Sequence, residues 1–192
     1  MSVEGFGRRA LRGYLGLVMG LIFLLAAMLS IYGFAIFRPS YQEMREVLRA
    51  VEVEDQPPSF SVHMLESGRG THWVTRYIAT RFLNLRYPTL EALPLQRPAD
   101  QILWSFFVEV LFSEEEIARL YCAIAWNGQS EGLGPLSRRL FSKAPQDLTP
   151  EEFALALAVF EWPQLLERER PKLEERASRI LSEYQQGVGS AN

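Results

Sequence analysis

The sequence is poor in the side chains that form disulfides and most transition-metal sites. Its 192 residues include one cysteine, Cys122, and two histidines, His63 and His72. One cysteine excludes an internal disulfide and a Cys-x-x-Cys metal site, and two histidines exclude a histidine-rich metal centre. The sequence also lacks any run with the alternating polarity of a β-strand. The expected fold class is therefore all-α.

Basic residues are outnumbered beyond residue 40, where 16 Lys and Arg residues face 22 Asp and Glu residues. This negative balance argues against nucleic acid as a partner, because nucleic acid is matched by clustered positive charge. Apolar residues make up 48% of the chain. A chain of this length and composition can bury one hydrophobic core, so we expect one globular domain.

Charged residues are absent from residues 14–37. As an α-helix this run would be about 36 Å long, enough to cross about 30 Å of hydrocarbon. Arg8, Arg9 and Arg12 precede it. The positive-inside rule then places residues 1–13 in the cytoplasm and the chain after residue 37 outside it. We therefore expect a single-pass protein of the inner (cytoplasmic) membrane.

A removable export signal is the alternative to this anchor. A cleaved signal peptide would have a shorter apolar core, of about 7–15 residues, and the only small-residue cleavage site near Ala35 is poor. The pair Arg8-Arg9 also resembles a twin-arginine export signal, though faintly.

The spacing of apolar residues predicts the secondary structure of the remaining chain. The membrane-proximal residues 38–50 are expected to form a polar helix, which Pro57 and Pro58 cannot continue. Further along we expect a loop over 56–70, a helix over 71–86, a connector over 87–98, a helix over 99–111 and a helical tail over 171–186. In the helix over 71–86, the residues in register for one buried face are Val74, Ile78, Phe82 and Leu85.

Two capping boxes mark helix starts between residues 113 and 157. Ser113 is followed three residues later by Glu116, and Thr149 by Glu152, with Pro150 at the first helical position. The run that follows Glu152, FALALAVF, is apolar all round and predicts a helix buried in the core.

The segment between these two helices is rich in glycine. Asn127-Gly128 is expected to stop the first helix, and Gly132 and Gly134 to keep the next loop loose. A short amphipathic segment follows, and its expected inward-facing residues are Leu136, Leu140 and Phe141.

Several short motifs recur through this stretch in a recognisable order. They are Ser113-Glu114-Glu115-Glu116-Ile117, Leu120-Tyr121, the glycine loop at 127–134, Phe141-Ser142-Lys143, and Asp147-Leu148-Thr149 with Glu152 and Ala154. Together they resemble the end of the peptidoglycan glycosyltransferase domain (glycosyltransferase family 51) of class A penicillin-binding proteins and monofunctional transglycosylases. The resemblance implies a lysozyme-like helical fold for residues 51–186, followed by a short tail over 187–192.

The resemblance also implies a reaction. Members of this family attach a lipid-linked disaccharide-peptide to a growing glycan, with a carboxylate as general base on the acceptor hydroxyl. The leaving pyrophosphate is stabilised by basic side chains or by a divalent metal, so an active domain would use Mg²⁺ or Mn²⁺ at most. No other cofactor is implied.

The family's first motif, E-D-x-x-F-x-x-H-x-G, resembles the stretch that starts at Glu54. Glu54-Asp55 is followed by Phe60 and His63, with the spacing between the last two kept. The resemblance implies that Glu54 is the general base and that Asp55 and His63 lie beside it. Four residues instead of two separate Asp55 from Phe60, so the alternative is that both carboxylates are solvated in a loop.

The second motif, G-G-S-T-I-T-Q-Q-L-x-K-N, aligns with residues 70–81 and has lost its glutamines and its lysine. Arg76 and Arg81 are the groups left there to meet a phosphate, and a solvated basic face is the alternative. The third motif, R-K-x-x-E, supplies Arg97 and places Gln101 where the second carboxylate belongs.

This replacement bears directly on catalysis. A neutral amide cannot hold a metal against pyrophosphate as a carboxylate does. Asp100 is one position away and would point about 100° round a helix, so it is no simple substitute for Gln101. Ala123 also stands where the family has asparagine in its Y-L-N motif.

For three other residues, the sequence favours a structural role over a functional one. Trp73 at a helix start is expected in the core instead of serving as a platform for a sugar. His72 shows no carboxylate partner in the sequence and is not expected to be a general base. Cys122 lies on an apolar helix and is expected to be a small buried hydrophobe.

These observations favour a membrane-anchored relative of the glycosyltransferases with weakened or lost catalysis, a possible pseudoenzyme of cell-wall biogenesis. Its expected partners are the lipid-linked peptidoglycan precursor or the glycan chain. The alternatives are an active polymerase with Glu54 as base, and a non-catalytic helical module that binds a cell-wall synthase or another envelope protein.

The topology can be tested directly. A reporter that is active only outside the cytoplasm, fused after Asn192, should be active, because the arginines hold the N-terminus inside. Mass spectrometry of the purified protein should find the N-terminus upstream of residue 14. A mature N-terminus near Ile36 would instead establish a cleaved signal.

Overall fold

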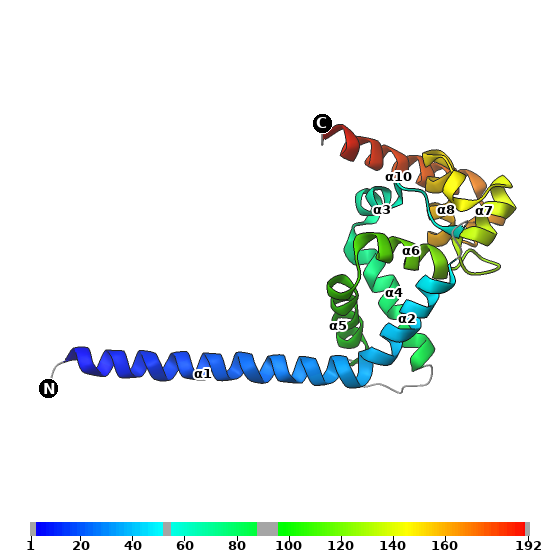
Figure 1. Cartoon of the computed structure of the whole chain (residues 1–192). Coiled ribbons are helices and arrows are strands. Elements are labelled where there is room, and N and C mark those ends of the chain that lie inside the picture. Colours follow the sequence, from blue (N-terminus) through cyan, green and yellow to red (C-terminus); the bar gives the residue numbers. More distant parts are fainter. Residues whose placement is uncertain (1–2, 52–54, 88–95, 191–192) are drawn as a thin grey trace. The chain divides into compact units, whose positions relative to one another are not determined.

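The computed structural model describes the backbone of residues 3–51, 55–87 and 96–190. Within these residues the chain is all-α, as expected, and contains no β-strand (Figure 1). The elements are α1 (Val3–Tyr32), the π-helical η1 (Gly33–Phe37), α2 (Arg38–Ala50), α3 (Ser61–Arg69), α4 (Thr71–Arg86), α5 (Gln96–Leu111), α6 (Glu114–Ile124), α7 (Leu133–Phe141), the 3₁₀ turn η3 (Pro145–Asp147), α8 (Pro150–Glu161), α9 (Leu165–Arg168) and α10 (Arg170–Ser190).

The chain divides into two compact units, Met1–Tyr41 and Gln42–Asn192. The first unit is built on α1, whose large apolar side chains from Tyr14 onward are exposed. This helix is long and apolar enough to cross a membrane, a test of length and composition that a signal sequence also passes. The expected helix over residues 38–50 has the bounds of α2.

The second unit is organised around α8, which is buried along almost its whole length. Phe153, Ala156, Ala158 and Val159 are fully enclosed, as the apolar run predicted. The most extensive packing onto α8 comes from α10, which buries Leu173 and two further apolar residues against the core. The backbone groups at the two ends of such a helix have no partner inside it, and here the start at Thr149 is exposed while the Glu161 side chain at the end is enclosed.

The N-terminus of α8 begins with the capping box predicted from the sequence. Thr149 Oγ1 accepts from the Glu152 N–H at 3.3 Å, and the Glu152 carboxylate accepts from the Thr149 N–H at 2.9 Å. Lys143 Nζ donates to the same carboxylate at 2.7 Å. Partial burial raises the pKa of Glu152, but the hydrogen bonds from Lys143 and Thr149 outweigh it and leave the pKa below its ordinary value.

The C-terminus of α8 ends on a buried ion pair. Glu161 accepts two hydrogen bonds from Arg176 of α10, at 2.7 and 3.1 Å. Both side chains are nearly enclosed, and the hydrogen bond that Arg176 donates to Glu161 raises the pKa of the guanidinium. The pair fixes the register of α10 on α8, since separating it would leave a buried charge alone.

Residues 56–70 were expected to form a loop, and this prediction is wrong, because α3 occupies Ser61–Arg69. The helix is stabilised by tertiary packing: Met64 and Leu65 are buried, and the preceding Phe60 meets Phe153 edge to face at 5.7 Å. A Cβ at Gly68 would make an ordinary van der Waals contact with Ile180 of α10, at 3.4 Å.

Helix bounds differ from expectation at three other places. α10 covers Arg170–Ser190, where a helix over 171–186 and a short tail over 187–192 were expected. α5 begins at Gln96 and not at residue 99, with Pro98 in its first turn, where no N–H is needed. α6 ends at Ile124, ahead of Asn127-Gly128. The helix over 71–86 has the predicted bounds, but Leu85 is 55% exposed and does not share the buried face.

The Thr149 cap yields a stability prediction. Thr149→Ala should lower the free energy of unfolding by about 0.5–2 kcal/mol, because a backbone N–H at the start of a buried helix loses its acceptor. Chemical unfolding of the full-length protein in detergent would measure the change. Thr149→Ser is the matched control, since it keeps the hydroxyl and should stay close to wild type. An unchanged midpoint for Thr149→Ala would contradict a capping role.

Candidate functional site

α4 is the helix around which most of the expected site residues are placed. It packs lengthwise on α5, and the two run antiparallel. His72, near the start of α4, contacts Glu109 near the end of α5, and Asn84, near the end of α4, contacts Arg97 at the start of α5. The four expected residues Arg76, Arg81, Arg97 and Gln101 therefore lie along one helix pair.

A polar cluster joins the two helices at the start of α4. His72 Nδ1 lies 3.2 Å from Glu109 Oε1, and the Thr75 hydroxyl donates to the same oxygen at 2.7 Å. Thr75 is buried, whereas the His72 side chain is 70% exposed. The expectation that His72 has no carboxylate partner is wrong, because Glu109 lies beside it. An exposed imidazole on a fixed carboxylate has the arrangement of an acid–base pair.

Arg81 is paired within the protein. Its guanidinium donates to the carboxylate of Glu131 in the loop after α6. One turn earlier on α4, the Tyr77 hydroxyl accepts from the Trp126 N–H at 3.1 Å, and Trp126 bridges to Glu131 through the backbone. α4 thus holds both ends of this loop. A phosphate that used Arg81 would have to displace Glu131 or share the guanidinium with it.

Asp55 is also paired, at the N-terminus of α7. Arg138 donates to its two oxygens at 2.7 and 3.3 Å. A Cβ on Gly134 would lie 2.6 Å from Asp55 Oδ1, so a side chain there would displace the Asp55 carboxylate. Gly134 was expected to loosen a loop; it instead lies within α7 and admits this carboxylate. Glu54, the candidate general base, lies outside the described residues.

Gln101 and Arg76 occupy different settings. Gln101 is half-buried on the side of α5 that carries the buried Trp104 and Val108. Asp100 lies at the opposite edge of that buried face, because adjacent helical residues are turned by about 100°. Arg76 is exposed on α4. At the start of α5, Arg97 donates to Asn84 at 2.8 Å.

His63 lies elsewhere. It is on α3, where its ring meets Tyr184 of α10 edge to face at 5.6 Å. Phe60, the other residue of the expected F-x-x-H pair, packs on Phe153 and Tyr184. These two residues hold α3 against α8 and α10. The structure therefore brings together the α4–α5 residues and leaves His63 apart from them.

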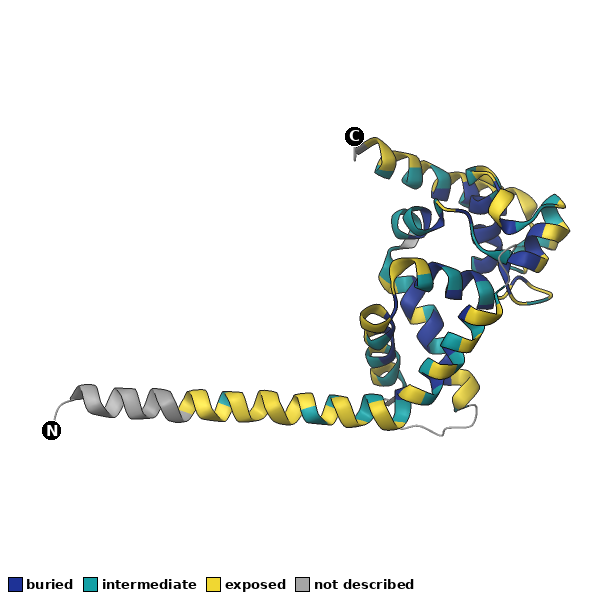
Figure 2. Ribbon diagram, viewed as in Figure 1, coloured by how far each residue is buried: buried dark blue, intermediate teal, exposed yellow. Residues whose placement is uncertain are grey.

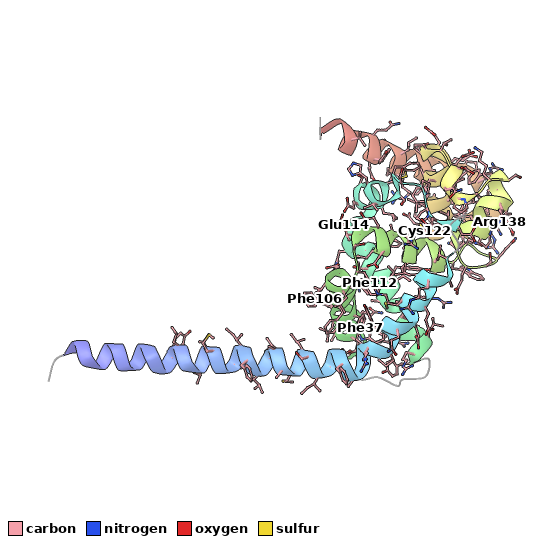
Figure 3. The ribbon with its side chains drawn as sticks, viewed as in Figure 1. Phe37, Phe106, Phe112, Glu114, Cys122 and Arg138 are labelled. Atoms are coloured by element: carbon pink, nitrogen blue, oxygen red, sulfur yellow. The ribbon has the colours of Figure 1, made fainter. Side chains whose placement is uncertain are left out.

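Trp73 and Cys122 fit the structural expectations. Trp73 is half-buried and meets the ring of Tyr121 at 5.8 Å. Cys122 is buried, and burial raises the pKa of its thiol to about 12, so no thiolate forms at neutral pH (Figure 3). Among the described residues, no three His, Cys, Asp or Glu side chains group as metal ligands would.

A cavity that the sequence did not reveal opens beside the loop that follows α6. Its volume is about 340 Å³. Its lining residues are Trp126, Asn127, Gly128, Gln129, Arg139, Pro163, Gln164, Leu166, Glu167 and Arg168. The lining combines a tryptophan that is 46% exposed with amides and two arginines. Such a surface can stack on an apolar ring face and hydrogen-bond hydroxyls or carboxylates around it.

The wall of this cavity is shaped by Asn127 and Gly128. The buried Asn127 side chain accepts from the N–H groups of Gln129 and Ser130 and donates to the Gly132 carbonyl at 3.2 Å. Gly128 has φ of +93°, and a Cβ there would lie 3.2 Å from Pro163. The Asn-Gly pair, expected to stop a helix, instead builds this turn.

No family model matches the chain, and a search of the curated proteins finds no match.

Proposed function

We propose that the chain is a membrane-anchored protein of the peptidoglycan glycosyltransferase type, with its helical domain outside the cytoplasm. It binds the lipid-linked disaccharide-peptide or the glycan chain and polymerises it weakly or not at all. The proposal combines the sequence resemblance with the arrangement of α4, α5 and α7. The apolar helix before the domain serves as an uncleaved anchor.

The observation that carries the loss of turnover is the setting of Gln101. On the resemblance, a carboxylate at this position serves the leaving pyrophosphate. Gln101 carries no charge, and Asp100 lies at the other edge of the buried face of α5. The remaining helix-pair arginines cannot replace a carboxylate, since they have the opposite charge. A metal bridge to pyrophosphate is therefore unsupported on this side of the site.

The observation that favours binding is the cavity beside Trp126. Sugars present an apolar ring face and a rim of hydroxyls, and the precursor peptide adds carboxylates. Trp126 offers the stacking surface, while Arg139 and the amides of Gln129 and Gln164 offer hydrogen bonds at its edge. Arg139 is itself positioned by its hydrogen bond to the Asn127 carbonyl at 3.2 Å.

The catalytic part of the proposal has a direct assay. Purified wild-type protein with lipid-linked disaccharide and Mg²⁺ or Mn²⁺ should give little or no glycan polymer. Loss of one transition-state contact of this kind typically costs about 10²–10³ in rate. Gln101→Glu should raise turnover only in part, since other family groups are also replaced. Robust wild-type turnover that is abolished by Glu54→Gln would overturn the proposal and install Glu54 as the base.

The binding part is tested at Trp126. Trp126→Ala should weaken the affinity for isolated glycan chains on the order of tenfold, which corresponds to about 1.4 kcal/mol. Trp162→Ala is the matched control: it is a second exposed tryptophan, 39% exposed, that lines a different depression. Titration calorimetry with both variants would separate the two outcomes. Equal affinities would remove the cavity as the glycan site, and no binding of glycan or precursor to wild type would favour a module that binds an envelope protein.

A further inference from the structure

α5 is apolar on two opposite sides. Its inner side buries Trp104 and Val108, both fully enclosed, where the helix packs on α4. Its opposite side carries Ile102, Phe106 and Val110, which are 60%, 52% and 62% exposed. Figure 2 shows that α5 carries both buried and exposed residues. Phe106 lies on the outside of the helix (Figure 3). A helix that is apolar all round is normally covered on all sides.

These three residues form a continuous strip because they recur every four positions. We call the strip, with the half-buried Leu103 and Phe107, the outer face of α5. The rings of Phe106 and Phe107 lie 6.1 Å apart, so the aromatic surface is continuous across the face. A contiguous apolar strip on a folded domain marks an interaction site more often than isolated exposed residues do.

The charges around the outer face are acidic. Asp100 and Glu109 lie on its two borders, one on each side. The single basic residue of α5, Arg97, lies at its first turn and donates to Asn84. The face is therefore unsuited to attraction by anionic groups and suited to apolar contact beside groups that carry an ammonium charge.

The chain itself indicates what covers this face. The apolar run ends at Phe37, and only residues 38–41 separate it from the compact domain that begins at Gln42. So short a connection, given the anchor proposed above, keeps the domain at the lipid surface at high effective concentration. We propose that the outer face of α5 docks on that surface, inserting Ile102, Phe106 and Val110 among zwitterionic lipids. Interfacial helices bind in this way through a buried apolar face.

The test uses the full-length chain, one copy per nanodisc of phosphatidylcholine. Phe106→Cys is labelled with a fluorophore sensitive to polarity, and lipids with a nitroxide on the acyl chain serve as quenchers. Cys122 is buried and its thiol pKa is raised to about 12, so only the introduced cysteine reacts. Gln185→Cys, on an exposed position of α10, is the matched control. Val110→Cys repeats the measurement if Phe106→Cys does not fold.

We expect quenching several-fold stronger at residue 106 than at residue 185, and weaker when anionic lipid is added, because Asp100 and Glu109 border the face. Equal, weak quenching at both positions would overturn lipid docking and leave the face to a protein partner. A chain that does not enter the nanodisc would overturn it as well. Glycan binding measured on the same labelled protein reports the proposed function separately, so either proposal can fail alone.

Discussion

Burial of α8 is the constraint on which the second unit depends. A helix with apolar residues on every side can exist in water only if other elements enclose it, and α7, α10 and the ring of Phe60 ahead of α3 contribute to this. The helix then leaves two polar ends, an exposed one at Thr149 and one at the enclosed Glu161 side chain. The Thr149 box with Lys143 satisfies the first, and the Glu161–Arg176 pair lies at the second. The positions of α10 and of the α7–α8 connection follow from these two ends.

A series of aromatic contacts connects the core around α8 to the cavity beside Trp126. Phe160 of α8 meets Tyr121 of α6 at 5.9 Å, and Tyr121 meets Tyr77 of α4 at 5.3 Å. Tyr77 then accepts the hydrogen bond from Trp126 that fixes one wall of the cavity. A shift of α8 would therefore move α4 and the loop beside it, because packed rings have little room to adjust independently. The candidate binding surface is therefore linked to the core through these ring contacts.

Sequence signals predicted the fold where they act over a few residues. Both capping boxes and the bounds of α4 depend on neighbours three or four positions apart, and all three are confirmed. The errors concern long-range contacts. Glu109 is far from His72 in sequence, and no local pattern predicts that a Cβ at position 134 would strike Asp55. The sequence pattern predicted a loop at Gly134 because the close approach of Asp55 comes from a distant segment and leaves no local signal.

The free energies of the ion pairs and of the contact expected at Gln101 differ in size. The pairs Asp55–Arg138 and Arg81–Glu131 are partly exposed, and exposed ion pairs contribute only about 0–1 kcal/mol. A substrate phosphate could therefore take Arg81 from Glu131 at small cost. A missing transition-state contact at Gln101 would cost about 2.7–4 kcal/mol, which no such exchange recovers. Binding of an anionic ligand is thus compatible with this arrangement. Under the proposed function, the neutral side chain of Gln101 is one of several replaced groups that would lower turnover. Arg81 and Arg138 could therefore bind a carboxylate or phosphate of a ligand. The free energy lost by breaking their exposed ion pairs is smaller than the free energy gained from new charge-assisted hydrogen bonds.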